Sequence, residues 1–151
     1  PWYQHIKKNN IPTIDEGNDV LIKVLVGKVK KISSAVQTYS PVSIFDVQFN
    51  KPGLVDLDIP KNQTVMVYVI DGELKFHNDN KIARNGQMIY FDHSSDIINL
   101  TSISITGSYL VLAGKPLNEP VVRYGPFVTN TEGDMKRAML DYQNDKMGTM
   151  I

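Results

Sequence analysis

Short apolar runs separated by turn residues make up most of the chain after position 19. Apolar and polar residues that alternate over about four to eight positions indicate a strand with one buried face. The runs predicted as strands are 20–29, 42–50, 54–59, 65–70, 73–77, 81–84, 87–91, 102–106 and 109–113. Strands this short, separated by turns this regular, favour an antiparallel β-sandwich or barrel.

Turn residues within this region predict how the strands connect. Gly27 interrupts the first run, which predicts a bulge or a turn. The run 65–70, VMVYVI, is almost wholly apolar, as expected of a central strand that is covered on both faces. Asp71-Gly72 then predicts a hairpin that leads into the strand 73–77.

The two ends of the chain depart from this pattern. Residues 1–17 carry prolines and a glycine but no periodicity, so we expect an irregular lead-in or inter-domain segment. Residues 18–114 contain the predicted strands and are expected to form one β domain. Residues 115–151 contain RYGPFVTNT and then a helical pattern, which predicts a turn followed by a packing helix.

The predicted helix near the C-terminus has a start signal, an apolar face and a stop signal. Thr131 or Asn130 can cap it, because either side chain accepts a hydrogen bond from the free amides of the first turn. Acidic residues follow in that turn, where the helix dipole favours them. The apolar face consists of Met135, Ala138, Met139 and Tyr142. Gly148 is the predicted end of the helix.

Charge and cysteine content exclude several classes of function. With 16 Lys+Arg against 16 Asp+Glu the net charge is zero, whereas binding to nucleic acid or acidic lipid needs a field of one sign. We therefore expect no direct nucleic-acid partner and no membrane. The chain has no cysteine, which excludes a thiol nucleophile and fits a reducing, cytoplasmic location.

The stretch from Gly53 to Gly72 has the spacing of a metal site. In metal-binding cupin barrels, positions at this spacing hold two histidines and a glutamate between the two glycines. A second motif supplies a further histidine. The corresponding slots in this chain hold Ile59, Lys61, Val65 and, in the second motif, Ile97.

These four side chains predict packing in place of metal binding. A divalent ion must exchange its water shell for protein donors, and three apolar side chains and an ammonium group supply none. We therefore predict no metal and no cofactor in this chain, with Ile59, Val65 and Ile97 in the core. The spacing is evidence for the fold and not for an activity.

The remaining candidate ligands do not form a set. His5 lies in the lead-in segment, His77 shares the polar face of its predicted strand, and His93 lies in a polar turn. Asp56 and Asp58 alternate on a strand face that is predicted to be solvated. No catalytic residue is predicted.

The C-terminal tail carries an unusual series of dipeptides. The segment AGKPLNEPVVRYGPFVTNTEGDMKRAMLDYQNDKMG closely resembles the C-terminal end of the pirin family, and WYQHI followed by IP resembles the start of its C-terminal half. The resemblance implies a cupin barrel, or double-stranded β-helix, without metal ligands. It also implies a parent protein whose N-terminal cupin barrel binds iron or another divalent metal through three histidines and a glutamate.

The tail also contains the candidate interface. Gly125-Pro126 predicts a rigid turn that presents the aromatic residue on either side of it. The candidate interface residues are Tyr124, Phe127, Met135, Met139 and Tyr142. They could pack within this chain, or dock on the N-terminal cupin domain of the parent or on another protein, and the sequence leaves these readings open.

Three functions remain as hypotheses. The first is a non-catalytic, metal-free C-terminal domain that supports the metal-bearing N-terminal barrel of a pirin-like parent and could offer a partner surface. The second is part of a quercetin 2,3-dioxygenase-like iron enzyme whose catalytic site lies in the missing N-terminal half. The third, an independent small-molecule-binding barrel, requires a hollow interior, which bulky apolar slot residues disfavour. The chain starts at Pro1, so we expect a longer parent.

Overall fold

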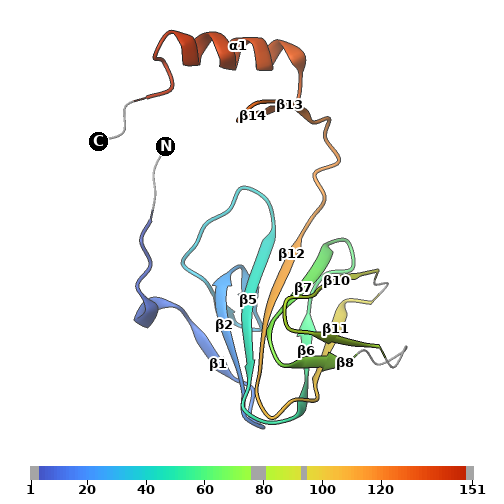
Figure 1. Cartoon of the computed structure of the whole chain (residues 1–151). Helices are drawn as coiled ribbons and strands as arrows, with labels where there is room; N and C mark the ends of the chain where they lie inside the picture. The colour runs from blue at the N-terminus through green and yellow to red at the C-terminus, as the bar shows by residue number, and fades with distance from the viewer. Residues whose placement is uncertain (1–3, 76–80, 93–94, 149–151) are drawn as a thin grey trace. The chain divides into compact units, whose positions relative to one another are not determined.

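The computed structural model describes residues 4–75, 81–92 and 95–148, and all elements below lie in these ranges. The chain divides into two compact units, Pro1–Pro116 and Leu117–Ile151, here called the sandwich unit and the tail unit. Strands dominate, and the described residues include one α-helix, near the C-terminus (Figure 1). The predicted class, mainly β with a C-terminal helix, is confirmed.

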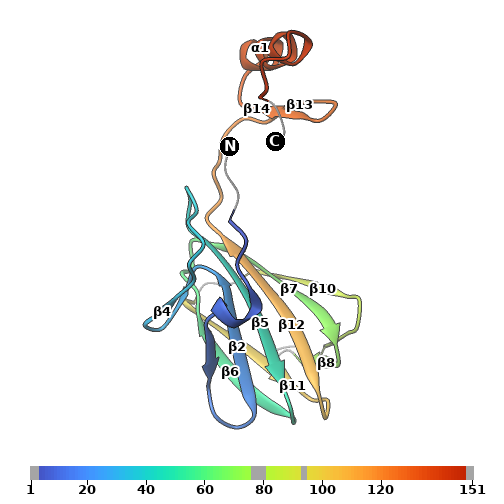
Figure 2. The ribbon, with the colours of Figure 1, turned by 90° about the vertical axis from the view of Figure 1, so that its left-hand side faces the viewer.

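Two antiparallel sheets form the sandwich unit (Figures 1 and 2). The larger sheet has the strand order β1-β2-β5-β12-β7-β10, and the smaller sheet has the order β6-β11-β8-β9. The larger sheet contains β1 (Thr13–Asp15), β2 (Val20–Val26), β5 (Val42–Phe49), β7 (Thr64–Asp71), β10 (Met88–Phe91) and β12 (Gly107–Gly114). The smaller sheet contains β6 (Gly53–Asp58), β8 (Glu73–Lys75), β9 (Ile82–Arg84) and β11 (Ile97–Ser102). A short hairpin, β3 (Lys28–Val29) with β4 (Ile32–Ser33), and the 3-10 turn η1 (Lys8–Asn10) complete the unit.

The core lies between the two sheets, because alternate residues of their strands point inward. In β12 every second residue is buried, and in β6 and β11 of the smaller sheet buried residues alternate mostly with exposed ones. Burying one large apolar side chain contributes about 1.5–3 kcal/mol. The largest fully buried side chains are Tyr109, Phe45, Phe49, Ile22, Leu57, Ile59, Leu74 and Leu100.

Strand β7 is central in its sheet, between β12 and β10, but the described residues cover only one of its faces. Val65, Val67 and Val69 are buried, whereas Met66 and Tyr68 on the opposite face are half-buried. The expectation that this strand is covered on both faces is therefore wrong for this chain.

The turn at Gly72 connects the two sheets and does not close the predicted hairpin. Strand β7 pairs with β10 and β12, whereas β8 pairs with β9 and β11. Gly72 has φ +85°, and a Cβ at this position would lie 2.6 Å from Thr106 O. The crossing therefore needs a residue without a side chain.

Two further expectations for the sandwich unit are wrong. The predicted strand 102–106 ends at its first residue, because the buried alternation belongs to β11, where Ile98 and Leu100 face the core. The lead-in segment is also not wholly irregular, since β1 pairs with β2. The break at Gly27 is confirmed, because this residue has φ +86° and separates β2 from β3.

The tail unit consists of a hairpin, β13 (Val122–Tyr124) with β14 (Phe127–Thr129), followed by α1 (Glu132–Gln143). Thr131 caps the helix as predicted, since its side chain accepts a hydrogen bond from Asp134 N at 3.1 Å. The helix ends before the predicted Gly148. Asn144 forms the C-cap, and its side-chain amide donates to Leu140 O at 2.6 Å, which satisfies a free carbonyl of the last turn.

Candidate functional site

The first and third ligand slots lie in the core. Ile59 is 1% exposed and Val65 is fully buried, so the prediction that these two residues pack in the interior is confirmed. Ile97 is 46% exposed, and the prediction for it is wrong. The buried residue at this end of β11 is Ile98, because the strand register turns Ile97 outward, beside its partner Asp58.

The two motifs do meet in space, through the backbone of the second slot. Asp96 O accepts a hydrogen bond from Ile59 N at 3.0 Å, and Asp96 Oδ1 accepts one from Lys61 N at 2.7 Å. The Lys61 residue itself is exposed. The start of β11 is therefore fastened to the end of β6, as in a site that joins two motifs, but the bonds are structural.

The residues at the slots do not fit a metal ion. Ile59 and Val65 have no lone pair to donate, and the Lys61 ammonium repels a cation. Gln63, between the second and third slots, is buried, and its Oε1 lacks a donor among the described residues, but a single amide oxygen is not a ligand set. Residues 4–75, 81–92 and 95–148 contain no group of three His, Cys, Asp or Glu side chains that could hold an ion.

The other candidate ligands are scattered or solvated. His5 is exposed before β1, while His77 and His93 lie outside the described residues. Asp56 and Asp58 are exposed on the outer face of the smaller sheet, as predicted. Asp56 Oδ1 accepts a hydrogen bond from Asn99 Nδ2 at 2.5 Å across the β6–β11 pair. This arrangement is an ordinary polar sheet surface.

A buried hydrogen-bond cluster occupies the core beside the Gly72 crossing. The Tyr109 hydroxyl donates to Glu73 O at 2.9 Å and lies 2.8 Å from Ser102 Oγ, which can donate to it. Both Tyr109 and Ser102 are fully buried. Burial raises the pKa of the Tyr109 phenol above its usual value, the Ser102 hydrogen bond lowers it, and the charges of Asp71 and Glu73 raise it. The cluster stabilises the neutral phenol and has no solvent access for catalysis.

We expect Tyr109→Phe to lower the free energy of unfolding by about 1–3 kcal/mol, because two buried polar groups lose their partner. The raised pKa adds a pH dependence. Stability that requires the neutral phenol is complete below about pH 10 and is lost as pH rises through the folded-state pKa. Urea unfolding between about pH 8 and 12 should show this alkaline loss in the wild type and not in the variant.

Tyr90→Phe is the matched control, because Tyr90 is exposed and its hydroxyl is not in the core. This variant should keep the wild-type pH profile. If Tyr109→Phe also keeps that profile, ionisation of Tyr109 is not linked to unfolding.

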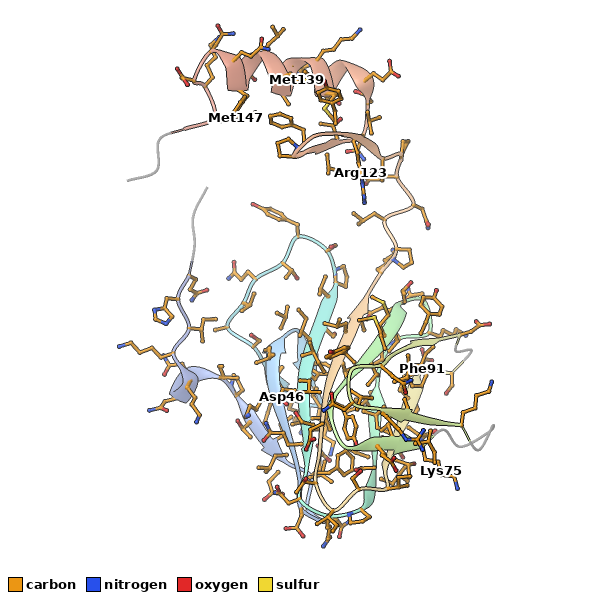
Figure 3. All side chains as sticks on the ribbon, in the orientation of Figure 1. Asp46, Lys75, Phe91, Arg123, Met139 and Met147 are labelled. Carbon is orange, nitrogen blue, oxygen red and sulfur yellow. The ribbon has the colours of Figure 1, made fainter. Side chains whose placement is uncertain are left out.

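The candidate interface residues divide into packed and exposed ones. Met135 is buried, and the rings of Phe127 and Tyr142 meet edge to face with their centroids 5.7 Å apart. Met139 is half-buried on α1 (Figure 3). The local-packing reading therefore accounts for part of the set. Tyr124 and Tyr142 remain largely exposed, and docking through them stays a prediction.

Sequence reasoning missed an apolar surface on the outer side of the larger sheet. Its residues come from runs such as VMVYVI and YLVLA, in which both strand faces are apolar. Those runs were read as strands covered on both sides. The signal was present, but it reported a need for cover that the described residues do not meet.

Comparison with known proteins decides the family. A sequence model described as the Pirin C-terminal cupin domain matches residues 44–148, which is more than half of the chain. The chain belongs to the pirin family. No helix in the described part of this pirin chain is long and apolar enough to cross a membrane.

Similar proteins are about twice as long as this pirin chain. Pirin-1 of Arabidopsis thaliana is 32% identical over 98% of the chain and 52% of its own length. Pirin of Mus musculus is 33% identical over 98% of the chain and 51% of its own length. The crystal structure of quercetin 2,3-dioxygenase from Acinetobacter baumannii superposes with a TM-score of 0.85 at 29% identity, covering 99% of this chain and 52% of that one. The cupin assignment of the sandwich unit is therefore confirmed.

Proposed function

We propose that this chain is the non-catalytic C-terminal cupin domain of a longer pirin, and that it supports a metal-bearing N-terminal cupin barrel. The observation that carries the proposal is the burial of Ile59 and Val65 at two positions where a metal cupin would place ligands. A packed interior of this kind gives a rigid scaffold and leaves no donor set for an ion.

The lengths of the relatives support the second half of the proposal. The chain spans about half the length of the relatives named above. The remaining half has the size of one further domain. Iron or another divalent metal would be bound there, and we expect the parent to act in the cytoplasm.

An alternative function concerns the parent and not this domain. The likeness to quercetin 2,3-dioxygenase of Acinetobacter baumannii favours a parent that is an iron enzyme, with its catalytic site in the N-terminal half. Under this alternative the present domain would still contribute no catalytic residue. An independent ligand-binding barrel is less well supported, because large apolar side chains fill the core.

Oxygen uptake with quercetin as substrate tests the proposal. The 151-residue chain, incubated with Fe(II) and desalted, should consume no oxygen above a blank that contains the same residual iron. Under the alternative, the longer parent consumes oxygen in the same assay. Turnover by the 151-residue chain itself would contradict a non-catalytic role.

A further inference from the structure

The outer side of the larger sheet carries a continuous apolar surface. Two neighbouring cross-strand rows run over β5, β12, β7 and β10, in the order of the sheet. Seven of the eight positions in these rows hold apolar side chains, and this set is called the apolar face. Its residues are Ile44, Leu112, Met66 and Tyr90 in one row and Leu110, Tyr68 and Met88 in the other.

The strand register fixes this arrangement. Leu112 lies between Ile44 and Met66, and Met66 pairs with Tyr90. In the second row Leu110 lies between Asp46 and Tyr68. Side chains directly opposite one another on the same sheet face are in contact range. The seven residues therefore form one patch and not a scatter of single exposed side chains.

The outer side of the smaller sheet shows what a solvated face of this protein looks like. There Asp56 pairs with Asn99, and Glu73 pairs with Arg84 through an ion pair of 2.9 Å. An antiparallel sheet commonly has one apolar and one polar face. The smaller sheet follows this rule, and the larger sheet does not.

Asp46 is the single polar position in the two rows, and Figure 3 labels it on β5. Its Oδ2 accepts from Lys23 Nζ at 3.0 Å and from Gln48 Nε2 at 3.0 Å. Its Oδ1 is buried and has no donor among the described residues. The charge is thus neutralised within this chain, and one acceptor on the face is left for a donor from outside.

We propose that the apolar face is the surface on which the N-terminal cupin barrel of the parent docks. This proposal rests on the proposed function, because it names the contact through which this domain supports its partner. Apolar patches of this kind mark interaction sites, and charged residues are depleted at the centre of interfaces.

The parent's own barrel is the occupant that the observations favour over a second copy. Relatives that match 98% of this chain carry about as much sequence again, which is one domain of similar size. A domain on the same polypeptide is present at a high effective concentration, so an apolar face of modest size suffices for stable docking. The face also needs no charged partner, since Lys23 and Asp46 neutralise each other.

Two single-cysteine variants test the proposal. The chain has no cysteine, so Met88→Cys places one thiol on the apolar face and Leu54→Cys places one on the outer side of the smaller sheet. The two native residues are each 55% exposed, which makes them a matched pair. Alkylation by iodoacetamide is followed by peptide mass spectrometry, in the 151-residue chain and in the full-length parent.

We expect similar alkylation rates for the two sites in the 151-residue chain. In the parent, Met88→Cys should react about tenfold more slowly, which corresponds to a docking equilibrium of about 1.4 kcal/mol, while Leu54→Cys keeps its rate. Unchanged reactivity of both sites in the parent would overturn the docking proposal and leave the proposed function standing. Concentration-dependent protection of Met88→Cys in the isolated chain would assign the face to a second copy and also overturn it. A parent gene that encodes no second barrel would contradict both proposals.

Discussion

Val65→Glu is expected to unfold most of the sandwich unit. The native side chain is fully buried on β7, where its register partners are Ala113 and Phe91. A carboxylate there has no cation partner, so it must either remain charged in an apolar core or take up a proton with a raised pKa. We expect a loss of roughly 4–5 kcal/mol or more, which is a large part of a typical stability of about 5–15 kcal/mol.

The measurement is guanidinium unfolding of purified protein, followed by circular dichroism. Lys61→Glu is the control, because it introduces the same side chain at an exposed slot and should change stability by only about 0.5 kcal/mol. If Val65→Glu unfolds at the wild-type midpoint, the third slot must open to water, and the account of a packed interior would be wrong.

Phe49→Ala is expected to have the second-largest effect, a loss of about 3–5 kcal/mol. Phe49 is 1% exposed, and its ring meets that of Tyr109 edge to face at a centroid distance of 5.7 Å. Truncation removes this aromatic pair and leaves a cavity between the two sheets, where the surrounding strands cannot collapse freely.

Urea unfolding with fitted m-values is the suitable measurement, because an unchanged m-value shows that the transition still exposes the same surface. Ile105→Ala provides the control, since Ile105 is 81% exposed and its truncation should be nearly neutral. A loss below about 1 kcal/mol for Phe49→Ala would indicate a loose interior, which an independent ligand-binding barrel would have.

Alternating hydrophobicity predicted the strands because each strand buries one face. The two slots in or beside the alternating runs, Ile59 and Val65, were placed correctly for that reason. Ile97 was placed by counting residues from a distant glycine. A count across a loop is not tied to the local register, and a shift of one residue turns a side chain from the core to the surface.

Long-range pairing explains the other errors. The segment 102–106 alternates by itself, but Ile105 has no sheet to face, and the strand that pairs with β6 lies immediately before it. Asp71-Gly72 is a good hairpin sequence, yet β7 and β8 find their partners in different sheets. Local sequence encodes the conformation of a turn and not the identity of the strands that it joins.

The two-sided apolar pattern of β7 and β12 was informative in a way that the sequence reading did not recognise. Such a pattern predicts cover on both faces. The described residues cover only the inner face, so the outer half of the pattern points to a partner beyond this chain. The metal-site spacing and this pattern thus carry separate information, the first about the fold and the second about docking.

The metal content of the purified 151-residue chain tests the central claim most directly. The protein would be incubated with excess Fe(II) under nitrogen, desalted, and analysed for iron and other divalent metals by elemental analysis. With Ile59, Lys61 and Val65 at the ligand slots, we predict far less than one bound metal ion per chain. One tightly bound ion per chain would contradict the account.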